Sequence, residues 1–442
     1  MKILLISRLF APKNVIGAVR PTQLAINLAK NGHEITCITE LTEGQLVDDK
    51  ALSPIVVHRV KTGTIGKANI RRESSPNISQ LIAKNNTVLA VSKKEKRNRA
   101  AKFIRNCLYV QVHSIDEYEW AKAACKKVEE LLRTNHYDIV FSSFGPSATV
   151  LAGLRIKSMH PDIVWVSDMR DPMTNDSQGY LRRKIYSYRE RQMIKKADAI
   201  TTISEALGKK YKEAQSAVRK RDTAVYVVEN GYDDSAITPL QSDDDGILRF
   251  GYTGTMYGGM RRMDSLFRAI KELESEKGKK LAVEIHYAGA EEQEIIDQAK
   301  RYDAVDYLSC HGSLSRKDAI LLQQKCDVLC VLSWNTKNEQ GVLTGKFPEY
   351  LKLRKPVLAI ITGDVEDAEL TERIKKLNIG YSYECIKDDQ FEDFKEWIKT
   401  CINRKENGQQ IIDAINDDEL EEYSYSRLAL KMERIFQLCI QQ

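Results

Sequence analysis

The chain has 442 residues, of which 42% are hydrophobic and 29% are charged. This length favours two domains, or three, over a single core, and the composition excludes a disordered chain. The net charge of +6 is small for the length, and no known nucleic-acid-binding motif accompanies it, so nucleic acid is not expected as a partner. No run of about 18 apolar residues is present, so the sequence predicts no membrane-spanning helix.

The cysteines point to a reducing compartment. The nine cysteines form no Cys-x-x-Cys motif, and Cys326 and Cys330 have no third cysteine or histidine near them in the sequence. A metal site is therefore not expected there, and we expect reduced thiols in a cytoplasmic protein.

Short apolar runs alternate with helical patterns along the first half of the chain. The opening "MKILLIS" is too short for a signal-peptide core and predicts a buried strand. Strands are predicted at Lys2–Ser7, Glu34–Thr39, Ile55–Val60, Asp138–Ser143, Ile163–Asp168, Ala199–Ile203 and Ala224–Val228. Helices are predicted between them at Pro21–Lys30, Asp116–Arg133, Ser147–Lys157, Tyr180–Lys196 and Ser204–Ala214.

The second half repeats the alternation. Strands are predicted at Leu248–Tyr252, Leu281–Ala288, Val305–Cys310, Asp327–Ser333, Pro356–Ile361 and Gly380–Glu384. Strands that are apolar throughout and separated by helices indicate parallel sheets covered on both faces. Two such sets predict an α/β chain of two doubly wound domains, with ligands bound beyond the carboxyl ends of the strands.

The polar, acidic segment "TPLQSDDDG" at 238–246 predicts the linker between the domains. We expect an N-terminal domain at 1–238, with a basic insertion at 61–115, and a C-terminal domain at 247–420. Residues 421–442 are expected to form a C-terminal helix that packs back on the N-terminal domain.

The insertion contains a basic run, "KKEKRNRAAKFIR" at 93–105, with seven basic residues and one acidic residue. Phe103 and Ile104 end this run, and Leu108 and Tyr109 follow it. A basic stretch with apolar neighbours favours binding to an anionic membrane surface; the alternative is a solvated helical face.

Polar residues follow two strands of the N-terminal domain. Gly17 and Arg20 follow the first strand without a G-x-G-x-x-G pattern, so NAD or FAD is not expected. Asp168, Arg170 and Asp171 crowd the end of another strand. They predict either a buried ion-pair network or a site that binds a polyhydroxyl ligand or supplies a base.

The C-terminal domain has a glycine-rich loop after its first strand, "GYTGTMYGGMRRMD" at 251–264. Such a loop can wrap a phosphate with its backbone N–H groups, and Arg261 and Arg262 stand at the start of the next helix. The alternative is a loose turn with solvated arginines. No Walker A sequence is present.

A short helix is predicted at 346–353, with Lys346 and Glu349 in its first turn. A helix N-terminus with a cation and a carboxylate can hold a phosphate and a ribose. The alternative is an ordinary surface ion pair between residues three apart.

Taken together, these stretches resemble the GT-B glycosyltransferases, and within them the retaining family 4 enzymes of polysaccharide biosynthesis. The resemblance covers nearly the whole chain and is carried by "GHEITCIT" at 32–39, "VWVSDMRDP" at 164–172, "VVENGYD" at 227–233 and "GKFPEYLKLRKPVLA" at 345–359. It implies a GT-B fold of two tandem Rossmann-like domains and a nucleotide-sugar donor.

The resemblance also implies roles for single residues. Glu349 would bind the ribose hydroxyls of the donor, while Lys346 and Arg261 would neutralise its diphosphate, with Arg262 as the alternative to Arg261. The implied catalytic residues are Arg261, Lys346, Asp168 and Arg170; the donor-binding residues are Gly17, Gly254, Thr255, Gly258, Arg262, Gly345 and Glu349; the acceptor-side residues are Arg20, Phe144 and Asp171.

The chain departs from the family pattern in three places. Gly341 stands where the family has a second glutamate, with Glu339 nearby, and Gly254–Thr255 replaces a Gly-Arg pair. The histidine that the family often carries is missing from "SSFGPSATV" at 142–150.

The expected function is transfer of a hexosyl or N-acetylhexosaminyl group from a nucleoside-diphosphate sugar, and the resemblance to the family favours UDP as the nucleotide. The acceptor would be a growing surface polysaccharide such as a capsule, a lipopolysaccharide or a lipid-linked oligosaccharide, reached from the cytoplasm or the inner face of the membrane. No Asp-x-Asp motif ends a strand, so neither a metal nor a cofactor is expected. A nucleotide-sugar 2-epimerase and a non-catalytic scaffold of a polysaccharide assembly complex remain the alternatives.

Overall fold

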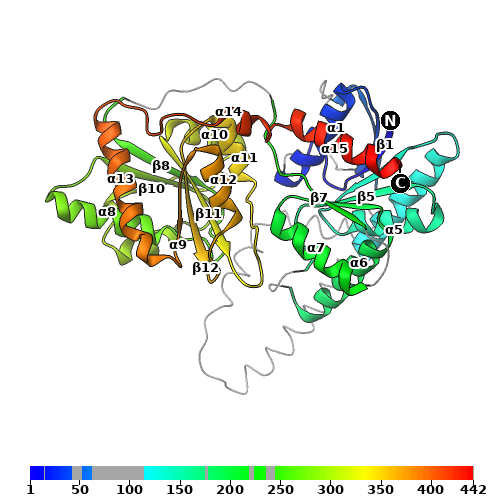
Figure 1. The fold of residues 1–442 in the computed structure, drawn as a ribbon, viewed down its shortest axis with the longest axis horizontal. Helices are drawn as coiled ribbons and strands as arrows, with labels where there is room; N and C mark the ends of the chain where they lie inside the picture. Colours follow the sequence, from blue (N-terminus) through cyan, green and yellow to red (C-terminus); the bar gives the residue numbers. More distant parts are fainter. Residues whose placement is uncertain are drawn as a thin grey trace, which may run out of the picture. The chain divides into compact units, whose positions relative to one another are not determined.

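The computed structural model describes residues 1–13, 15–41, 52–61, 114–174, 178–218, 223–234 and 244–441 (Figure 1). The chain divides into two compact units. Unit 1 comprises Met1–Glu229 together with Tyr425–Gln442, and unit 2 comprises Asn230–Ser424. Most of the basic insertion at 61–115, including 93–105, and most of the linker predicted at 238–246 lie outside the described residues.

Unit 1 is built on a parallel sheet in the order β3-β2-β1-β4-β5-β6-β7. Its strands are β1 (Lys2–Ile6), β2 (Glu34–Glu40), β3 (Ile55–Val60), β4 (Ile139–Ser143), β5 (Val164–Met169), β6 (Ala199–Thr202) and β7 (Ala224–Val227). All seven strand predictions for this half are confirmed, with ends that differ by one residue at most.

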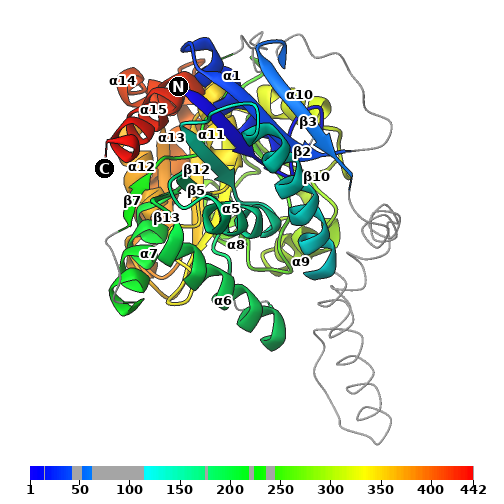
Figure 2. The ribbon, with the colours of Figure 1, turned by 90° about the vertical axis from the view of Figure 1, so that its right-hand side faces the viewer.

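Helices cover both faces of the unit 1 sheet, as the apolar strands require. Ile3 and Leu5 of β1 pack into one core, and Leu4 and Ile6 pack into another, because neighbouring side chains of a strand point to opposite faces. The first core receives α1 (Ile16–Lys30) and α15 (Tyr425–Ile440), which lie side by side (Figure 2). The second receives a helix at 114–132, α5 (Ala148–Met159), α6 (Tyr180–Lys196) and α7 (Glu205–Val218).

Helix α1 begins earlier than predicted. The sequence places its start at Pro21, since proline favours the first helical position, but the helix begins at Ile16 and contains Pro21 in its interior. Pro21 has no N–H to donate to the carbonyl of Gly17, four residues before it. That carbonyl therefore needs a partner from outside the helix, and the candidate site supplies one.

Unit 2 is built on a parallel sheet in the order β10-β9-β8-β11-β12-β13. Its strands are β8 (Leu248–Thr253), β9 (Val283–Ala288), β10 (Leu308–Cys310), β11 (Val328–Asn335), β12 (Val357–Gly363) and β13 (Gly380–Glu384). Its helices are α8 (Asp264–Lys277), α9 (Glu292–Arg301), α10 (Arg316–Lys325), α11 (Lys346–Leu353), α12 (Glu369–Leu377), α13 (Phe391–Glu406) and α14 (Asp417–Glu421). The six predicted strands are confirmed, except that Val305–Tyr307 forms a short 3-10 helix before β10.

Helix α11 turns one face to the core and leaves the other for the site. Phe347, Tyr350 and Leu351 are buried against β11 and β12 residues, which fixes the rotation of the helix. Lys346 and Glu349 stand three residues apart and are half-buried on its remaining face. The packing of the apolar face thus holds the charged pair at a fixed place beside the sheet.

Both sheets reverse their winding direction once. In unit 1 the chain runs outward from β1 to β3 and returns to place β4 on the other side of β1. In unit 2, β8 and β11 are neighbours in the same way. Doubly wound sheets bind ligands outside the carboxyl ends of the strands at these switch points, so both edges are candidate sites. Among the helices described, none is long and apolar enough to cross a membrane.

Candidate functional site

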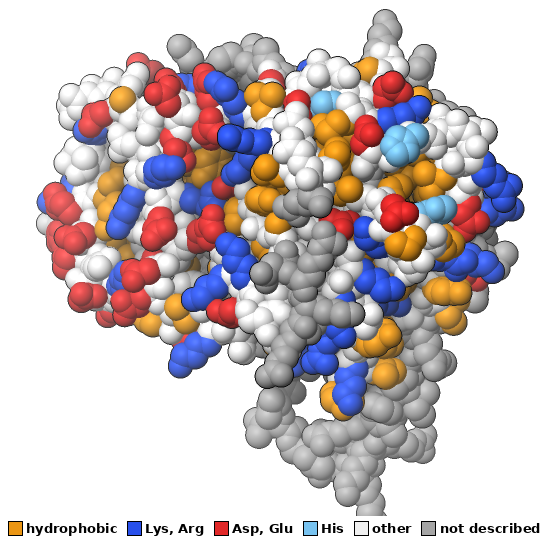
Figure 3. Space-filling model, turned by 45° about the vertical axis from the view of Figure 1, so that its right-hand side comes forward, with side chains coloured by type: hydrophobic (Ala, Val, Ile, Leu, Met, Phe, Trp, Pro, Cys, Tyr) orange, Lys and Arg blue, Asp and Glu red, His pale blue; other side chains and the backbone are white. Residues whose placement is uncertain are grey.

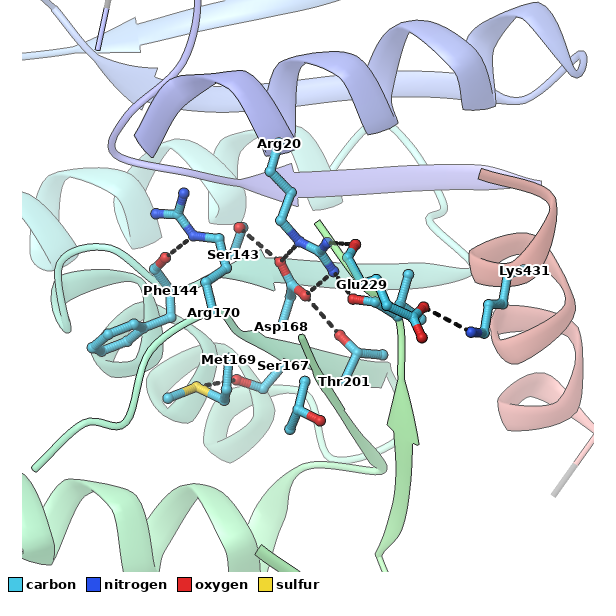
Figure 4. A network of polar contacts seen from close by, with 12 residues as sticks. Arg20, Ser143, Phe144, Ser167, Asp168, Met169, Arg170, Thr201, Glu229 and Lys431 are labelled. Atoms are coloured by element: carbon cyan, nitrogen blue, oxygen red, sulfur yellow. Dashed lines mark hydrogen bonds and ion pairs between the residues drawn. The ribbon is translucent and has the colours of Figure 1, made fainter. Parts of the chain in front are cut away.

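An ion pair lies buried at the carboxyl edge of the unit 1 sheet (Figure 4). Arg20 donates from Nε and Nη2 to the two carboxylate oxygens of Asp168, at 3.0 and 2.8 Å. Ser143 and Thr201 donate to the same oxygens at 3.0 and 2.9 Å. Arg20 also donates to the backbone carbonyl of Val228 at 2.9 Å, and to that of Glu229.

The charges of this pair stabilise each other away from water. Asp168 is 0% exposed and Arg20 is 2% exposed. Burial alone would raise the pKa of the Asp168 carboxyl, but the charge and hydrogen bonds of Arg20 outweigh burial and hold that pKa below its usual value. These contacts match the buried ion-pair network, which was one of the two interpretations of the charged residues that end this strand. The predicted catalytic role of Asp168 and the predicted acceptor contact of Arg20 stay predictions, since neither side chain reaches solvent here.

Arg170 lies on the same edge but has different partners. Its Nε donates to the carbonyl of Phe144 at 2.6 Å, and its Nη1 donates to the carbonyl of Gly17 at 2.6 Å. The Gly17 carbonyl is the one that Pro21 leaves free, so the proline in α1 creates an acceptor for this arginine. Arg170 is 9% exposed, and no carboxylate among the described residues forms an ion pair with it. Asp171, next in the chain, is exposed.

Gly145 makes room for the Arg170 guanidinium, and Gly17 makes room for the side chain of Leu9. A Cβ atom on Gly145 would stand 2.0 Å from Nη2 of Arg170, and one on Gly17 would stand 2.7 Å from the side chain of Leu9. Gly145 also has a φ of +129°, which side chains disfavour. The sequence pointed to Gly17, whereas the need for Gly145 became visible only from the packing of Arg170.

In unit 2, Arg261 lies buried at the switch point between β8 and β11. Its Nη1 donates to the hydroxyl of Tyr252 and to the carbonyl of Thr255, at 3.2 and 3.3 Å. Its guanidinium lies over the rings of Tyr257 and Trp334, with centroids at 4.4 and 5.6 Å. The side chain is 9% exposed, and its Nε is buried without a hydrogen-bond partner.

The hydroxyl of Tyr252 orients this arginine. Burial raises the pKa of Tyr252 to about 12, so the hydroxyl stays protonated at neutral pH and donates to the Thr255 carbonyl at 2.8 Å. The same oxygen accepts from Arg261. No carboxylate among the described residues pairs with Arg261, which leaves a positioned positive charge at the edge of the sheet.

The glycine-rich loop already holds an anion from the protein. The sequence predicted that its backbone N–H groups wrap a phosphate, but those of Met256, Tyr257 and Gly258 donate to the carboxylate of Glu291, at 2.6, 3.2 and 3.1 Å. Glu291 follows β9 and was not singled out from the sequence. Its partners lie 33–35 residues away in the chain, so no local pattern reveals the contact.

The remaining predicted donor-binding residues of this loop have structural contacts. The N–H of Gly254 donates to the carbonyl of Ala288 at 2.9 Å, and a Cβ on Gly254 would stand 3.0 Å from the Tyr252 hydroxyl. Arg262 pairs with Asp264 at 2.7 Å and its side chain is 48% exposed. Arg261, rather than Arg262, is therefore the buried arginine of this edge.

The first turn of α11 carries the predicted charged pair. Gly345 is the residue before the helix, and Nζ of Lys346 lies 2.9 Å from Oε2 of Glu349. The other carboxylate oxygen of Glu349 lies 3.7 Å from Nε of Arg316, at the start of α10. Arg316 is a further cation that the sequence did not indicate. Glu349, whose side chain is 13% exposed, thus stands between two cations.

A second carboxylate lies at the end of β11. The indole Nε1 of Trp334 donates to Glu339 at 3.1 Å, and the N–H of Glu339 donates to the Thr336 carbonyl at 3.1 Å. Gly341, two residues on, has a φ of +66°. Glu339 is therefore held next to the ring that covers Arg261. In the part of the chain that the structure describes, no group of three or more histidine, cysteine, aspartate or glutamate residues could hold a metal ion.

Comparisons with known proteins support the architecture. No family model and no curated protein matches this sequence. Among solved structures, sucrose-phosphate synthase from Thermosynechococcus elongatus has a TM-score of 0.61 at 11% identity, over 100% of this chain and 99% of that one. The lipopolysaccharide outer core galactosyltransferase WaaB has a TM-score of 0.55 at 14% identity, over 99% and 100%. The fold is GT-B.

A third similar structure is that of an E. coli protein described as trehalose-6-phosphate bound with UDP-2-fluoro glucose, with a TM-score of 0.59 at 10% identity over 99% of both chains. The whole-chain coverage means that both units of this protein have counterparts in the GT-B structures. At such identities the likeness extends to the fold, and the chemistry has to be argued from this chain's own residues.

Proposed function

We propose that this protein is a retaining glycosyltransferase of family 4 type that uses a nucleoside-diphosphate sugar, with UDP as the favoured nucleotide. The observation that supports this most is the buried Arg261 at the unit 2 switch point, which has no carboxylate partner among the described residues. The GT-B fold and the UDP-2-fluoro glucose in a similar structure fit the same conclusion.

In this proposal the diphosphate lies against fixed cations. Arg261 is held by Tyr252, Thr255 and two aromatic rings, so its charge is in place before the reaction starts. Lys346 supplies a second charge at the N-terminus of α11, where the helix dipole also favours an anion. Negative charge grows on the diphosphate as the glycosidic bond breaks, so these groups stabilise the transition state more than the bound substrate.

Glu349 would accept hydrogen bonds from the ribose hydroxyls. Lys346 and Arg316 flank its carboxylate and hold it in place, and its two oxygens can accept from the two hydroxyls of a diol. The Arg20–Asp168 pair is proposed to support the unit 1 edge, because its polar atoms are used within the protein. We propose that the transfer uses no metal, since cationic side chains of the protein neutralise the negative charge of the leaving diphosphate.

The acceptor is proposed to be a surface polysaccharide, a lipopolysaccharide or a lipid-linked oligosaccharide, met at the inner face of the membrane. Helix α6 has an exposed surface of tyrosine and basic side chains that could contact the membrane in this proposal. Tyr180 and Tyr188 of α6 are 73% and 66% exposed, and Lys184, Arg191 and Lys195 are exposed beside them. Figure 3 shows basic and hydrophobic side chains together, with few acidic ones, on the lower part of its face, where α6 lies in Figure 1. Such a surface complements anionic headgroups.

Nucleotide binding to the full chain tests the proposal. UDP, GDP, ADP and their sugars would be compared by thermal shift, because a ligand that binds only the native state raises the melting temperature. We expect a shift with one nucleoside diphosphate, reduced in Lys346→Ala and Glu349→Gln. Lys352→Ala removes a cation from the other end of the same helix and should keep the shift.

Acceptor dependence separates the alternatives. A transferase consumes its donor faster when the acceptor is present, whereas a 2-epimerase converts the donor without any acceptor. A scaffold would show no shift with any nucleotide, and that result would overturn the proposal.

A further inference from the structure

The described residues include five buried arginines, and their partners divide them into two groups. Arg8 pairs with Glu40 and Asp116, Arg20 pairs with Asp168, and Arg189 pairs with Glu117. Arg170 and Arg261 have no carboxylate partner among the described residues. Arg261 follows β8 at the switch point of unit 2, and Arg170 donates to the carbonyl of Phe144, which follows β4, and to that of Gly17 in the first turn of α1. Arg8 also lies at the unit 1 switch point, after β1, but it has carboxylate partners.

A buried cation that forms no ion pair is costly for the free protein. Carbonyl groups from Phe144 and Gly17 partly satisfy the Arg170 guanidinium, but they carry no full negative charge. Burial lowers the pKa of Arg170, and the charges of Asp168 and Asp171 offset burial only in part. The three other buried arginines of unit 1, Arg8, Arg20 and Arg189, each have a carboxylate partner.

The surroundings of Arg170 add positive potential. Gly17 is the second residue of α1, and Gly145 lies three residues before α5, so the N-termini of both helices face this region. The residue before α1, Val15, has no side-chain cap, and Ile16 is 61% exposed, so the start of α1 is open to solvent. Helix N-termini and an arginine between glycines are a combination that binds oxyanions.

We propose that Arg170, with the N-terminus of α1 at Gly17, binds an oxyanion group on the acceptor, a phosphate or a carboxylate. This rests on the proposed function. In the proposed function Arg261 and Lys346 of unit 2 neutralise the diphosphate of the donor, so a separate cation in unit 1 serves the other substrate. The acceptor is then an anionic glycan or a phosphorylated glycan carrier rather than a neutral sugar.

Inorganic phosphate is the probe for this site. Calorimetric titration of phosphate into the full chain would be run in the presence of saturating nucleoside diphosphate, which occupies the unit 2 site. Loss of hydrogen bonds to a charged group costs about 1.5–3 kcal/mol, so we expect Arg170→Met to weaken phosphate about 10- to 150-fold. Arg170→Lys keeps the charge and should lose less. Glucuronate and glucose in further titrations distinguish a carboxylate acceptor from a phosphate one.

Arg189→Met is the matched control. It removes an arginine that is 8% exposed in unit 1, but one that has a carboxylate partner, so it should lower stability and leave phosphate affinity unchanged. Should Arg189→Met not fold, Arg183→Met on the exposed side of α6 replaces it. Equal phosphate affinity in wild type and Arg170→Met would overturn the proposal.

The nucleotide arm separates this inference from the proposed function. Arg170→Met should keep nucleoside-diphosphate affinity within about twofold, while Lys346→Ala loses it. If Arg170→Met also loses the nucleotide, Arg170 belongs to the donor site and the inference is wrong. If no nucleotide binds wild type but phosphate binding in nucleotide-free protein still depends on Arg170, the proposed function fails and the anion site stands.

Discussion

Asp168→Asn should destabilise unit 1 far more than an ordinary substitution. The asparagine keeps the size of the side chain but removes the charge that faces Arg20, and it leaves the Arg20 guanidinium buried at 2% exposure without a counter-charge. Breaking one side of a buried ion pair costs about 3–5 kcal/mol, out of a typical total of about 5–15 kcal/mol for a domain.

The contacts of Asp168 predict a graded series. Ser143→Ala and Thr201→Ala each remove one hydrogen bond to the carboxylate, at 3.0 and 2.9 Å, and each should cost about 1.5–3 kcal/mol or less. Arg20→Met with Asp168→Leu removes both charges together. That double variant should be less destabilised than the sum of the single variants, because neither charge is left alone.

Urea unfolding followed by tryptophan fluorescence measures the effect, with Trp120 and Trp165 reporting on unit 1. Because the folded-state pKa of Asp168 is below its usual value, the unfolded chain takes up the proton first as pH falls. The stability from the pair is therefore present above about pH 4 and decreases below it, and Asp168→Asn should lack this decrease. If Asp168→Asn retained stability within about 1 kcal/mol of wild type but lost turnover, Asp168 would be a catalytic residue rather than a supporting one.

Three further predictions address the site and the surface. Lys346→Ala and Glu349→Ala should each reduce turnover by the equivalent of about 2–4 kcal/mol while the melting temperature stays near that of wild type; wild-type rates in both would place the donor elsewhere. Transfer should survive excess EDTA, since Arg261 and Lys346 are proposed to serve the leaving group; loss of activity with rescue by Mn²⁺ would contradict this. Binding to anionic vesicles should weaken with rising salt. Vesicle binding should be lost when Lys93, Lys94, Lys96, Arg97 and Arg99 become Glu, and it should be reduced by about 1 kcal/mol per cation when Lys184, Arg191 and Lys195 become Glu. The same change at Lys300, Lys375 and Lys376 is the control. Equal pelleting with neutral and anionic lipid would exclude an electrostatic surface.

The strands were predictable because their signal is local. A buried parallel strand needs apolar side chains on both faces, so each one stands out as a short apolar run, and the thirteen predicted strands are all present. The pair at Lys346 and Glu349 was predictable for the same reason, since residues three apart on a helix meet whatever surrounds them. The order of these local signals predicted two doubly wound domains, and the resemblance of several sequence stretches to the GT-B glycosyltransferases implied the GT-B fold.

Contacts between residues that are far apart in the sequence were not predictable. Arg20 and Asp168 are 148 residues apart, and the sequence left both a ligand site and a buried ion-pair network open for Asp168. Only the fold shows that Arg20 is its partner. The sequence predicted that the N–H groups of the glycine-rich loop bind a phosphate. Only the placement of β9 beside β8 brings the carboxylate of Glu291 to these N–H groups. A charged residue gives the same local signal whether its counter-charge comes from the protein or from a substrate. Tertiary structure alone decided that Arg20 has a carboxylate partner while Arg170 and Arg261 have none among the described residues, because pairing depends on which strand ends the sheet order makes neighbours.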